Sequence, residues 1–361
     1  MSIPIESGPS LTYLNTAAVG RVSPASLTRA AAFNEQLATN PSAAFAGWME
    51  EDLPVLRAQV ARLVGTDASR IAFVPNFSYG LSAVLQSLSG RLRRVLLFED
   101  DYPSVNLPVT LGNFEVSYLK STDGFSIPFS EIRSAVISRR VEAVIVSHVQ
   151  FLTGFMLDAR ELGTFCRDHG VVLILDATQS MGCIDYRLDG FPAQVVISSG
   201  YKWLNGGYGL GVLYMEASFL ERFAPRIAGF ASMTRDPGGW HYSPSMRSFE
   251  PGHYPVTALL QLQEAVSERL RQGQATVERH DLALASRLAE GLEKTAFRVR
   301  GGVSGSRAAV VCFDAPAAVG EYLAARNFVI TWRRGMIRVS PHFYNTPSEI
   351  DGLVEALAGY R

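Results

Sequence analysis

The sequence predicts an α/β protein with a mostly parallel central sheet. Five short apolar runs recur between residues 95 and 215, each of a length typical of a buried strand. They read VLLFE (95–99), AVIVSHV (143–149), VVLILD (171–176), VVISS (195–199) and GVLYM (211–215). The stretch 159–169 between two of these runs has helical apolar spacing. Continuous apolar strands between amphipathic helices indicate a sheet that is covered on both faces.

The chain before this region predicts an arm, two helices and one further strand. Residues 1–10 are polar and interrupted by Gly and Pro, and we interpret them as an arm. Residues 24–38 and 52–64 have helical spacing, the second with a proline near its start. The apolar strand of 70–75 then leads through Asn76–Gly80 into a helix over 81–88.

The chain after residue 215 predicts a long loop, a long helix and a smaller α+β C-terminal domain. The loop spans 226–255, is rich in Gly, Pro and aromatic residues, and is followed by a helix over roughly 256–295. The C-terminal piece consists of a strand at 308–313, a helix at 317–326, strands near 328–331 and 336–340, and a helix at 347–358.

Composition excludes several classes of function. The 361 residues are 47% hydrophobic and 19% charged, with a net charge of −1, which argues against disorder and gives no electrostatic footprint for nucleic acid or membrane. No apolar run approaches the roughly 20 residues that cross a bilayer. Three cysteines without a close pair argue against a disulfide framework, and the histidines lack metal-ligand spacing. We therefore expect a reduced, cytoplasmic enzyme.

Lysine is scarce in this chain, and one lysine has an unusual context. Of 33 basic residues only Lys120, Lys202 and Lys294 are lysines. Lys202 lies in the segment SGYKWLNGG (199–207), just beyond the end of a predicted strand. A lysine partly removed from water has a lowered pKa and can act as a Schiff-base nucleophile, although a surface loop lysine is the ordinary alternative.

Two further polar residues follow another strand. Asp176 ends the run VVLILD, so its carboxylate should be half-buried and in need of a cationic partner. It could cap the following turn, or pair with a protonated pyridine nitrogen. Gln179, three residues later, could donate to a ring phenolate.

Two more segments complete a possible cofactor site. Tyr102 follows a strand end, where an aromatic ring could stack on a flat cofactor or be an ordinary loop tyrosine. Phe77 and Ser78 lead from a strand into a helix, where backbone N–H groups and a hydroxyl suit a phosphate. In such sheets ligands bind beyond the carboxyl ends of the strands, so these groups should meet. Together they fit pyridoxal 5′-phosphate.

The chain resembles the class V aminotransferase family of fold type I, which includes cysteine desulfurases, selenocysteine lyases, kynureninases and isopenicillin N epimerase-like proteins. The resemblance rests on YLNTAA (13–18), DATQS (176–180), SGYKWL (199–204) and IRVSPHFYNT (337–346). It implies a large cofactor-binding domain over 15–250, a linking helix and small domain over 251–361, and an arm over 1–14 that packs near the small domain.

The resemblance also implies residue roles. Lys202 forms the Schiff base with the cofactor and later shuttles the α-proton, while Arg338 grips the substrate α-carboxylate. The other cofactor-binding residues are Asp176, Gln179, Tyr102, Phe77, Ser78, Ser199 and Tyr201. Asn15 and Ala17 contribute to the substrate pocket. The loop FEPGH (249–253) would reach into the partner subunit, so that His253 serves the partner's phosphate site in a homodimer with shared active sites.

The reaction stays open between several outcomes of an external aldimine with a small α-amino acid. Amino-group transfer is the preferred expectation. The segment 327–335 holds no cysteine, and Cys166, Cys183 and Cys312 are interpreted as structural, which disfavours a persulfide mechanism. A C–S or C–Se β-lyase without a catalytic cysteine remains an alternative.

The residues are also compatible with a kynureninase-like hydrolase or with a non-catalytic partner protein that binds the cofactor. Tyr201–Lys202 favours the hydrolase, whereas 227–230 matches its substrate loop poorly. The identity of the amino acid stays open, as does contact of Phe151 or His148 with the cofactor. Arg333 and Arg334 are interpreted as solvated, with binding of an acidic side chain as the alternative.

Overall fold

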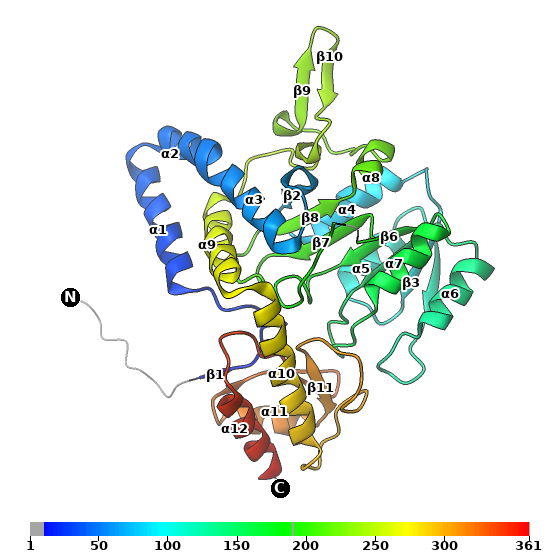
Figure 1. Cartoon of the computed structure of the whole chain (residues 1–361), viewed down its shortest axis with the longest axis vertical. Helices are drawn as coiled ribbons and strands as arrows, with labels where there is room; N and C mark the ends of the chain where they lie inside the picture. The colour runs from blue at the N-terminus through cyan, green and yellow to red at the C-terminus, as the bar shows by residue number, and fades with distance from the viewer. Residues whose placement is uncertain (1–10, 190, 361) are drawn as a thin grey trace.

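A computed structural model of the chain describes residues 11–189 and 191–360, and its centre is a seven-stranded sheet (Figure 1). The strand order is β2-β8-β7-β6-β5-β3-β4. These strands are β2 (Ile71–Val74), β3 (Arg94–Phe98), β4 (Glu115–Leu119), β5 (Ala143–Ser147), β6 (Val172–Asp176), β7 (Val195–Ser199) and β8 (Gly211–Met215). The strand β8 is antiparallel to β2 and β7, and all other neighbouring strands of the sheet are parallel. The prediction of a mostly parallel sheet is therefore confirmed.

Helices cover both faces of this sheet, as the apolar strands predicted. Along β6, Leu173 and Leu175 pack into one hydrophobic cluster while Val172 and Ile174 pack into the other. The first cluster is covered by α3 (Leu53–Val64), α6 (Phe129–Ser138), α7 (Ala159–Asp168) and α9 (Val256–Gln272). The second is covered by α4 (Phe77–Leu88), α5 (Pro103–Thr110) and α8 (Ala217–Arg222). Burial on both faces explains why the strands are continuously apolar.

The C-terminal part has a separate small sheet and its own hydrophobic cluster. Its elements are β11 (Val311–Asp314), β13 (Thr331–Arg333), β14 (Met336–Val339), α10 (Gln274–Leu292), α11 (Ala317–Ala324) and α12 (Pro347–Ala358). The sheet is antiparallel, with β14 between β11 and β13. Leu14 is buried in this cluster, and β1 (Thr12–Tyr13) pairs with β12 (Phe328–Val329). The predicted domain boundaries at 14/15 and 250/251 stay predictions, and residues 1–10 lie outside the described part.

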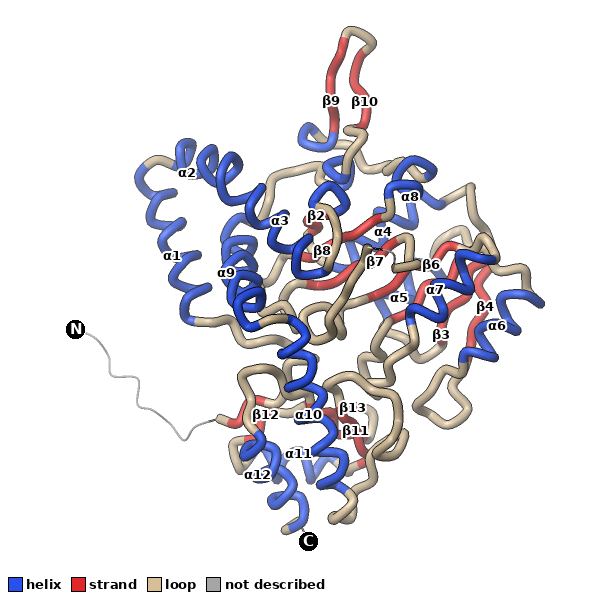
Figure 2. The backbone as a smooth tube through the Cα atoms, viewed as in Figure 1, coloured by secondary structure: helices blue, strands red, loops and turns tan. Residues whose placement is uncertain are grey.

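Several elements differ from the predictions. The single helix over 256–295 is instead two helices, α9 and α10, because Gly273 between them adopts a left-handed φ of 83°. The predicted loop 226–255 contains a hairpin, β9 (Met233–Asp236) and β10 (Gly239–Tyr242), which projects from the body of the molecule (Figure 2). The helix α4 begins at Phe77 rather than at residue 81.

The N-terminal helices also extend beyond the prediction. They are α1 (Pro24–Thr39) and α2 (Pro41–Gly47), followed by a π-helical turn (Trp48–Asp52) that continues into α3. Short 3-10 turns occur at Ala68–Arg70, Phe230–Ser232 and Met246–Phe249. None of the described helices is long and apolar enough to cross a membrane.

Candidate active site

A cavity of about 430 Å³ lies beyond the carboxyl ends of the central strands. It is lined by residues that follow β2, β3, β5, β6 and β7, as expected for ligand sites in parallel sheets. The lining residues are Asn76, Phe77, Ser78, Tyr79, Tyr102, Ser104, Ser147, Phe151, Asp176, Thr178, Gln179, Ser199, Tyr201, Lys202, Tyr208 and Gly209. The structure thus brings together Lys202, Asp176, Gln179, Tyr102, Phe77, Ser78, Ser199 and Tyr201, all named from the sequence.

Lys202 is a buried amine in this cavity. Its side chain is 7% exposed, and burial together with the positive charge of Arg338 lowers its pKa to about 8 even though Asp176 opposes the shift. The ammonium lies 5.6 Å from the ring centroid of Tyr102 and 5.7 Å from that of Tyr201. Two aromatic rings therefore flank the amine.

The loop that carries Lys202 is held by the N-terminal segment. The N–H of Gly20 donates to the carbonyl oxygen of Tyr201 at 2.9 Å. A Cβ atom at Gly20 would lie 1.9 Å from the carbonyl oxygen of Lys202, so only glycine permits this approach. The residues before α1 therefore set the position of the lysine backbone.

Asp176 ends β6 at the cavity, where burial raises the pKa of its carboxyl to about 7. The N–H of Thr178 donates to Asp176 Oδ1 at 2.8 Å, which opposes this shift, as does the nearby Lys202. The Thr178 hydroxyl accepts from the N–H of Ser199 at 3.1 Å and ties the ends of β6 and β7 together. Thr178 was not predicted as a site residue, although it lies within the DATQS motif.

The N-terminus of α4 offers free backbone donors to the cavity. The side chain of Asn76 caps the helix by accepting from the N–H of Tyr79 at 3.0 Å. Among the described residues, no acceptor meets the N–H groups of Phe77 and Ser78, and the positive end of the helix dipole adds to them. An anion such as a phosphate fits this place.

Tyr208 is another cavity residue that was not predicted from the sequence. Its ring stacks on that of Tyr201, with centroids 4.9 Å apart and an interplanar angle of 25°. Tyr208 is 66% exposed and lies in a glycine-rich loop, so neither burial nor periodicity pointed to it. It extends the aromatic wall beside Lys202.

Gln179 is fixed at both ends of its amide. Its Nε2 donates to the carbonyl oxygen of Ala17 at 3.0 Å, and its Oε1 accepts from the indole N–H of Trp203 at 2.8 Å. One N–H of this amide is left for a ligand. Ala17 and Asn15 do not line the cavity; Ala17 orients Gln179, and Asn15 Oδ1 accepts from the hydroxyl of Thr331 at 2.7 Å. Their substrate contacts stay predictions.

Arg338 lies on β14 behind the cavity wall. It is 6% exposed, and one of its terminal nitrogens donates to the carbonyl oxygen of Phe151 at 2.6 Å. Its Nε has no partner among the described residues, and burial lowers the pKa of the guanidinium to about 10. A buried cation with an unpaired donor is suited to an anionic ligand.

Contact with the cofactor was left open for Phe151 and His148, and only one of these two residues lines the cavity. Phe151 lines the cavity, and its ring meets that of Tyr102 edge-on at 5.3 Å. His148 does not line it; its Nδ1 contacts the hydroxyls of Ser180, at 3.1 Å, and Tyr186. Burial lowers the pKa of His148 to about 4, so it is a neutral residue of the interior.

His253 lies outside the cavity of its own chain. Its ring packs against that of Phe45, with centroids 5.6 Å apart. The loop before it is anchored by Glu250, which is 3% exposed and pairs with both terminal nitrogens of Arg57 at 3.0 Å. The contribution of His253 to the phosphate site of a partner subunit stays a prediction.

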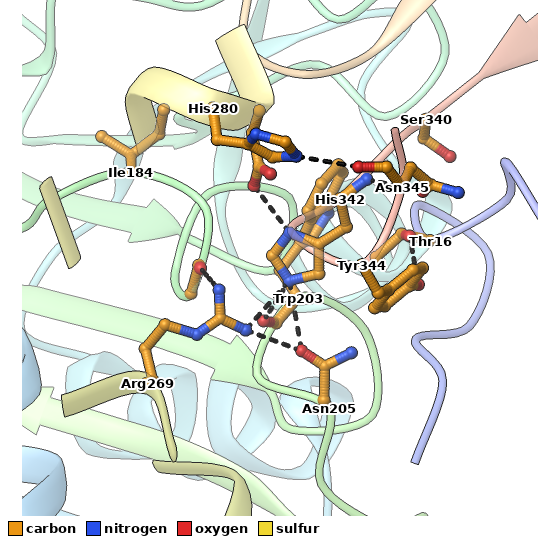
Figure 3. A network of polar contacts seen from close by, with 12 residues as sticks. Thr16, Ile184, Trp203, Asn205, Arg269, His280, Ser340, His342, Tyr344 and Asn345 are labelled. Atoms are coloured by element: carbon orange, nitrogen blue, oxygen red, sulfur yellow. Dashed lines mark hydrogen bonds and ion pairs between the residues drawn. The ribbon is translucent and has the colours of Figure 1, made fainter. Parts of the chain in front are cut away.

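A buried polar network supports the Lys202 loop from behind (Figure 3). Arg269 donates to Asn205 Oδ1 at 2.9 Å and lies 3.1 Å from His342 Nε2. His342 Nδ1 pairs with Asp281 Oδ2 at 2.6 Å, and its Nε2 lies 3.1 Å from the carbonyl oxygen of Trp203. The network joins α9, α10 and the segment after β14 to the residues that follow Lys202.

The donor set fits pyridoxal 5′-phosphate. Lys202 supplies an amine of lowered pKa, Asp176 a carboxylate for a protonated ring nitrogen, and the start of α4 an anion site, all on one cavity. Tyr102 offers a ring face beside the lysine.

Comparison with known proteins gives the same assignment. The family described as Aminotransferase class-V matches residues 12–353. The isopenicillin N epimerase of Streptomyces clavuligerus is 25% identical over 97% of this chain and 94% of its own length. An uncharacterized aminotransferase of Bacillus subtilis, YcbU, is 23% identical over 86% of this chain and 85% of its own length.

Solved structures share the fold. A complex of the cystine C–S lyase C-DES with its product cysteine persulfide has a TM-score of 0.87, with 22% identity over 97% of this chain and 98% of that chain. The apo cysteine desulfurase of Thermococcus onnurineus NA1 has a TM-score of 0.84, with 21% identity over 97% and 95%. The cavity and the family match over nearly the whole chain lead to one conclusion: this protein belongs to the class V aminotransferase family of pyridoxal phosphate enzymes.

Proposed function

We propose that this enzyme transfers the amino group of a small α-amino acid. The observation that carries the proposal is the placement of the Lys202 amine and the Asp176 carboxylate on one buried cavity, with the Arg338 guanidinium close enough to lower the lysine pKa. Pyridoxal phosphate, when bound, supplies a carbonyl group that combines with amines and a ring that withdraws electrons from the bonds at Cα.

The residues of the cavity would bind the cofactor and move the α-proton. Asp176 would hold the protonated ring nitrogen, and the α4 N-terminus with Ser78, Ser199 and Tyr201 would hold the phosphate. Lys202 would bond the carbonyl group and, once released by the substrate amine, accept and return the α-proton. Its lowered pKa leaves a useful fraction of free amine near neutral pH.

Arg338 would bind the α-carboxylate and so orient the amino acid toward Lys202. This role uses the Nε that has no partner among the described residues. Tyr102 would cover one face of the cofactor ring, and Gln179 would donate its remaining N–H to the phenolic oxygen.

A C–S or C–Se β-lyase is the second candidate, favoured by the shared fold of the cystine C–S lyase. All three cysteines are buried, and burial raises the pKa values of the Cys166 and Cys312 thiols to about 12 and that of Cys183 well above its usual value. None of them lines the cavity. A lyase here would therefore act without a protein persulfide.

We also propose a homodimer in which each chain completes the other's site. The support is the loop of His253, which is anchored at Glu250 by contacts with Arg57 and the N–H of Phe73 and does not line the cavity of its own chain. Unpaired cysteines agree with the cytoplasmic location that the sequence predicts.

Absorption spectra of the purified enzyme test the proposal. We expect a visible cofactor band that is lost in Lys202→Ala and kept in Lys294→Ala. Amino-group transfer predicts that one amino acid bleaches the band and that a keto acid restores it. A band that survives turnover while pyruvate or alanine accumulates would support the lyase. Cofactor binding without turnover of any amino acid would contradict both.

A further inference from the structure

We propose that Arg333 is a second anion-binding residue of the substrate site, and that the site takes α-amino acids whose side chains carry a second carboxylate. This inference rests on the proposed function, because it concerns the same cavity. The proposal specifies the class of substrate, which membership of the family leaves open.

The register of β13 and β14 places the two arginines on one face. Thr331 lies opposite Arg338, and Arg333 lies opposite Met336 in the antiparallel pair. Side chains of directly opposed residues share a face, as do those of residues two apart on one strand. Arg333 and Arg338 are therefore diagonal neighbours on the same side of the hairpin.

This face of the hairpin packs against the cavity wall at Phe151. Met336 shares a hydrophobic cluster with Phe151, and Arg338 donates to its carbonyl oxygen at 2.6 Å. The guanidinium carbon of Arg333 lies 5.3 Å from the centroid of the Phe151 ring. Phe151 in turn meets Tyr102, whose ring lies 5.6 Å from the Lys202 ammonium. Both arginines thus border the wall beside the reactive lysine.

Neither guanidinium has a counter-ion in the described part of the chain. Other arginines do pair with carboxylates, as Arg57 does with Glu250 and Arg287 with Asp351. No described carboxylate lies within 4.0 Å of Arg333 or Arg338. Instead the two cations repel, and the charge of Arg333 contributes to lowering the pKa of Arg338. Two uncompensated neighbouring cations favour a ligand with two anionic groups.

Arg338 and Arg333 differ in burial, and this difference indicates which carboxylate of the substrate each would bind. Arg338 is buried and its charge acts on Lys202, so it suits the α-carboxylate next to the reacting carbon. Arg333 is exposed and lies farther along the hairpin, so it suits the carboxylate at the end of the side chain. Thr331, directly opposite Arg338, already donates its hydroxyl to Asn15 Oδ1 at 2.7 Å.

The test compares acidic amino acids with their amides in three proteins. The substrates are aspartate against asparagine and glutamate against glutamine, pairs that match in size and differ in charge. The proteins are the wild type, Arg333→Gln and Arg334→Gln. Arg334 is the matched control, because it is exposed on the same hairpin and loses the same charge.

We expect the wild type and Arg334→Gln to favour the acid over the amide in kcat/KM for at least one pair. Arg333→Gln should lower kcat/KM for that acid about tenfold, as for loss of a charge-assisted contact, and leave the amide unchanged. A wild type that favours both amides would overturn the proposal. An acid preference that survives in Arg333→Gln, or falls equally in Arg334→Gln, would overturn it as well.

A binding measurement separates this proposal from the proposed function. Succinate and glutarate have no amino group, so calorimetry on the cofactor-loaded enzyme reports anion recognition without turnover. Their binding should weaken about tenfold in Arg333→Gln and hold in Arg334→Gln. That result without turnover of any amino acid would reject the proposed reaction and support the second anion site. Equal binding by all three proteins would reject the site.

Discussion

At the scale of single residues, burial decides the chemistry of the cavity. Lys202 has a pKa lowered from 10.5 to about 8, so the folded chain holds a neutral amine over a pH range in which the unfolded chain does not. The folded state therefore binds fewer protons between pH 8 and 10.5, and this group's contribution to stability rises with pH across that window.

This shift predicts the pH dependence of cofactor uptake. The rate at which the apo-protein takes up pyridoxal phosphate should rise with pH through a midpoint near 8. Asp176→Asn should move the midpoint lower, because the carboxylate of Asp176 favours the charged lysine. Stopped-flow absorbance measures both. A midpoint above pH 10 in the wild type would show that burial does not tune this amine.

The glycine beside the lysine gives a second prediction. Gly20→Ala would place a Cβ 1.9 Å from the carbonyl oxygen of Lys202 and should destabilise the protein by about 1–3 kcal/mol, with lower cofactor occupancy. In Gly47→Ala the new Cβ meets nothing within 4 Å inside a helix, so a gain of about 0.5–1 kcal/mol is expected. Urea unfolding measures the stability of both variants. Equal changes in the free energy of unfolding would contradict the close approach of Gly20 to the carbonyl oxygen of Lys202.

Half of the residues that line the cavity were named from the sequence, because each follows an apolar strand and the carboxyl ends of parallel strands meet at one edge of a sheet. Lys202 and Asp176 were found in this way. Thr178 was missed because its contribution is a backbone contact to Asp176 and a hydroxyl contact to Ser199. Asn15 and Ala17 were named from motif resemblance. Neither lines the cavity, where Ala17 instead orients Gln179, and their contact with a substrate stays a prediction.

At the scale of elements, α9 and α10 bring the small C-terminal sheet to the Lys202 loop through buried polar contacts. Arg269 is 4% exposed and reaches Asn205, His342 and the carbonyl oxygen of Gly182. Since Arg269 and Asp281 are both buried, loss of the arginine would leave the Asp281 carboxylate without the guanidinium charge that faces it.

Arg269→Met should therefore lower the free energy of unfolding by about 3–5 kcal/mol. Arg271, two residues later on α9, is an exposed residue whose ion pair with Glu264 is 3.7 Å long, so Arg271→Met should change stability by less than about 1 kcal/mol. Denaturant unfolding measures both variants. Similar losses would mean that the network contributes no more than a surface pair.

The buried strands were the elements best predicted, since β6 has no polar residue before its last position and β7 has none before its last two. The strand β4 was missed, because its sequence EVSYL is only half-buried at the sheet edge. The helices α9 and α10 were predicted as one, because apolar spacing continues past Gly273 and does not report the change in direction there. The apolar pattern of a sequence reports which residues are buried. It does not report that β4 lies at the sheet edge or that the backbone turns at Gly273.

At the scale of the whole molecule, a shared site predicts complementation between two inactive chains. Lys202→Ala lacks the amine of the cavity, and His253→Ala lacks the residue that we propose each chain gives to its partner. Random mixing of the two chains should restore about a quarter of wild-type activity, because half of the dimers are mixed and each has one intact site. Co-expression followed by assay tests this. Activity no higher than the sum of the separate variants would mean that His253 serves no partner.

The most direct test of the central claim is to map the cofactor attachment. The chain has only three lysines, so reduction of the loaded enzyme with borohydride, digestion and mass spectrometry can assign the modified residue without ambiguity. We predict modification in the peptide that contains Lys202, and none in the peptides of Lys120 and Lys294. Attachment at either of those lysines, or no attachment at all, would contradict the account of this cavity as the active site.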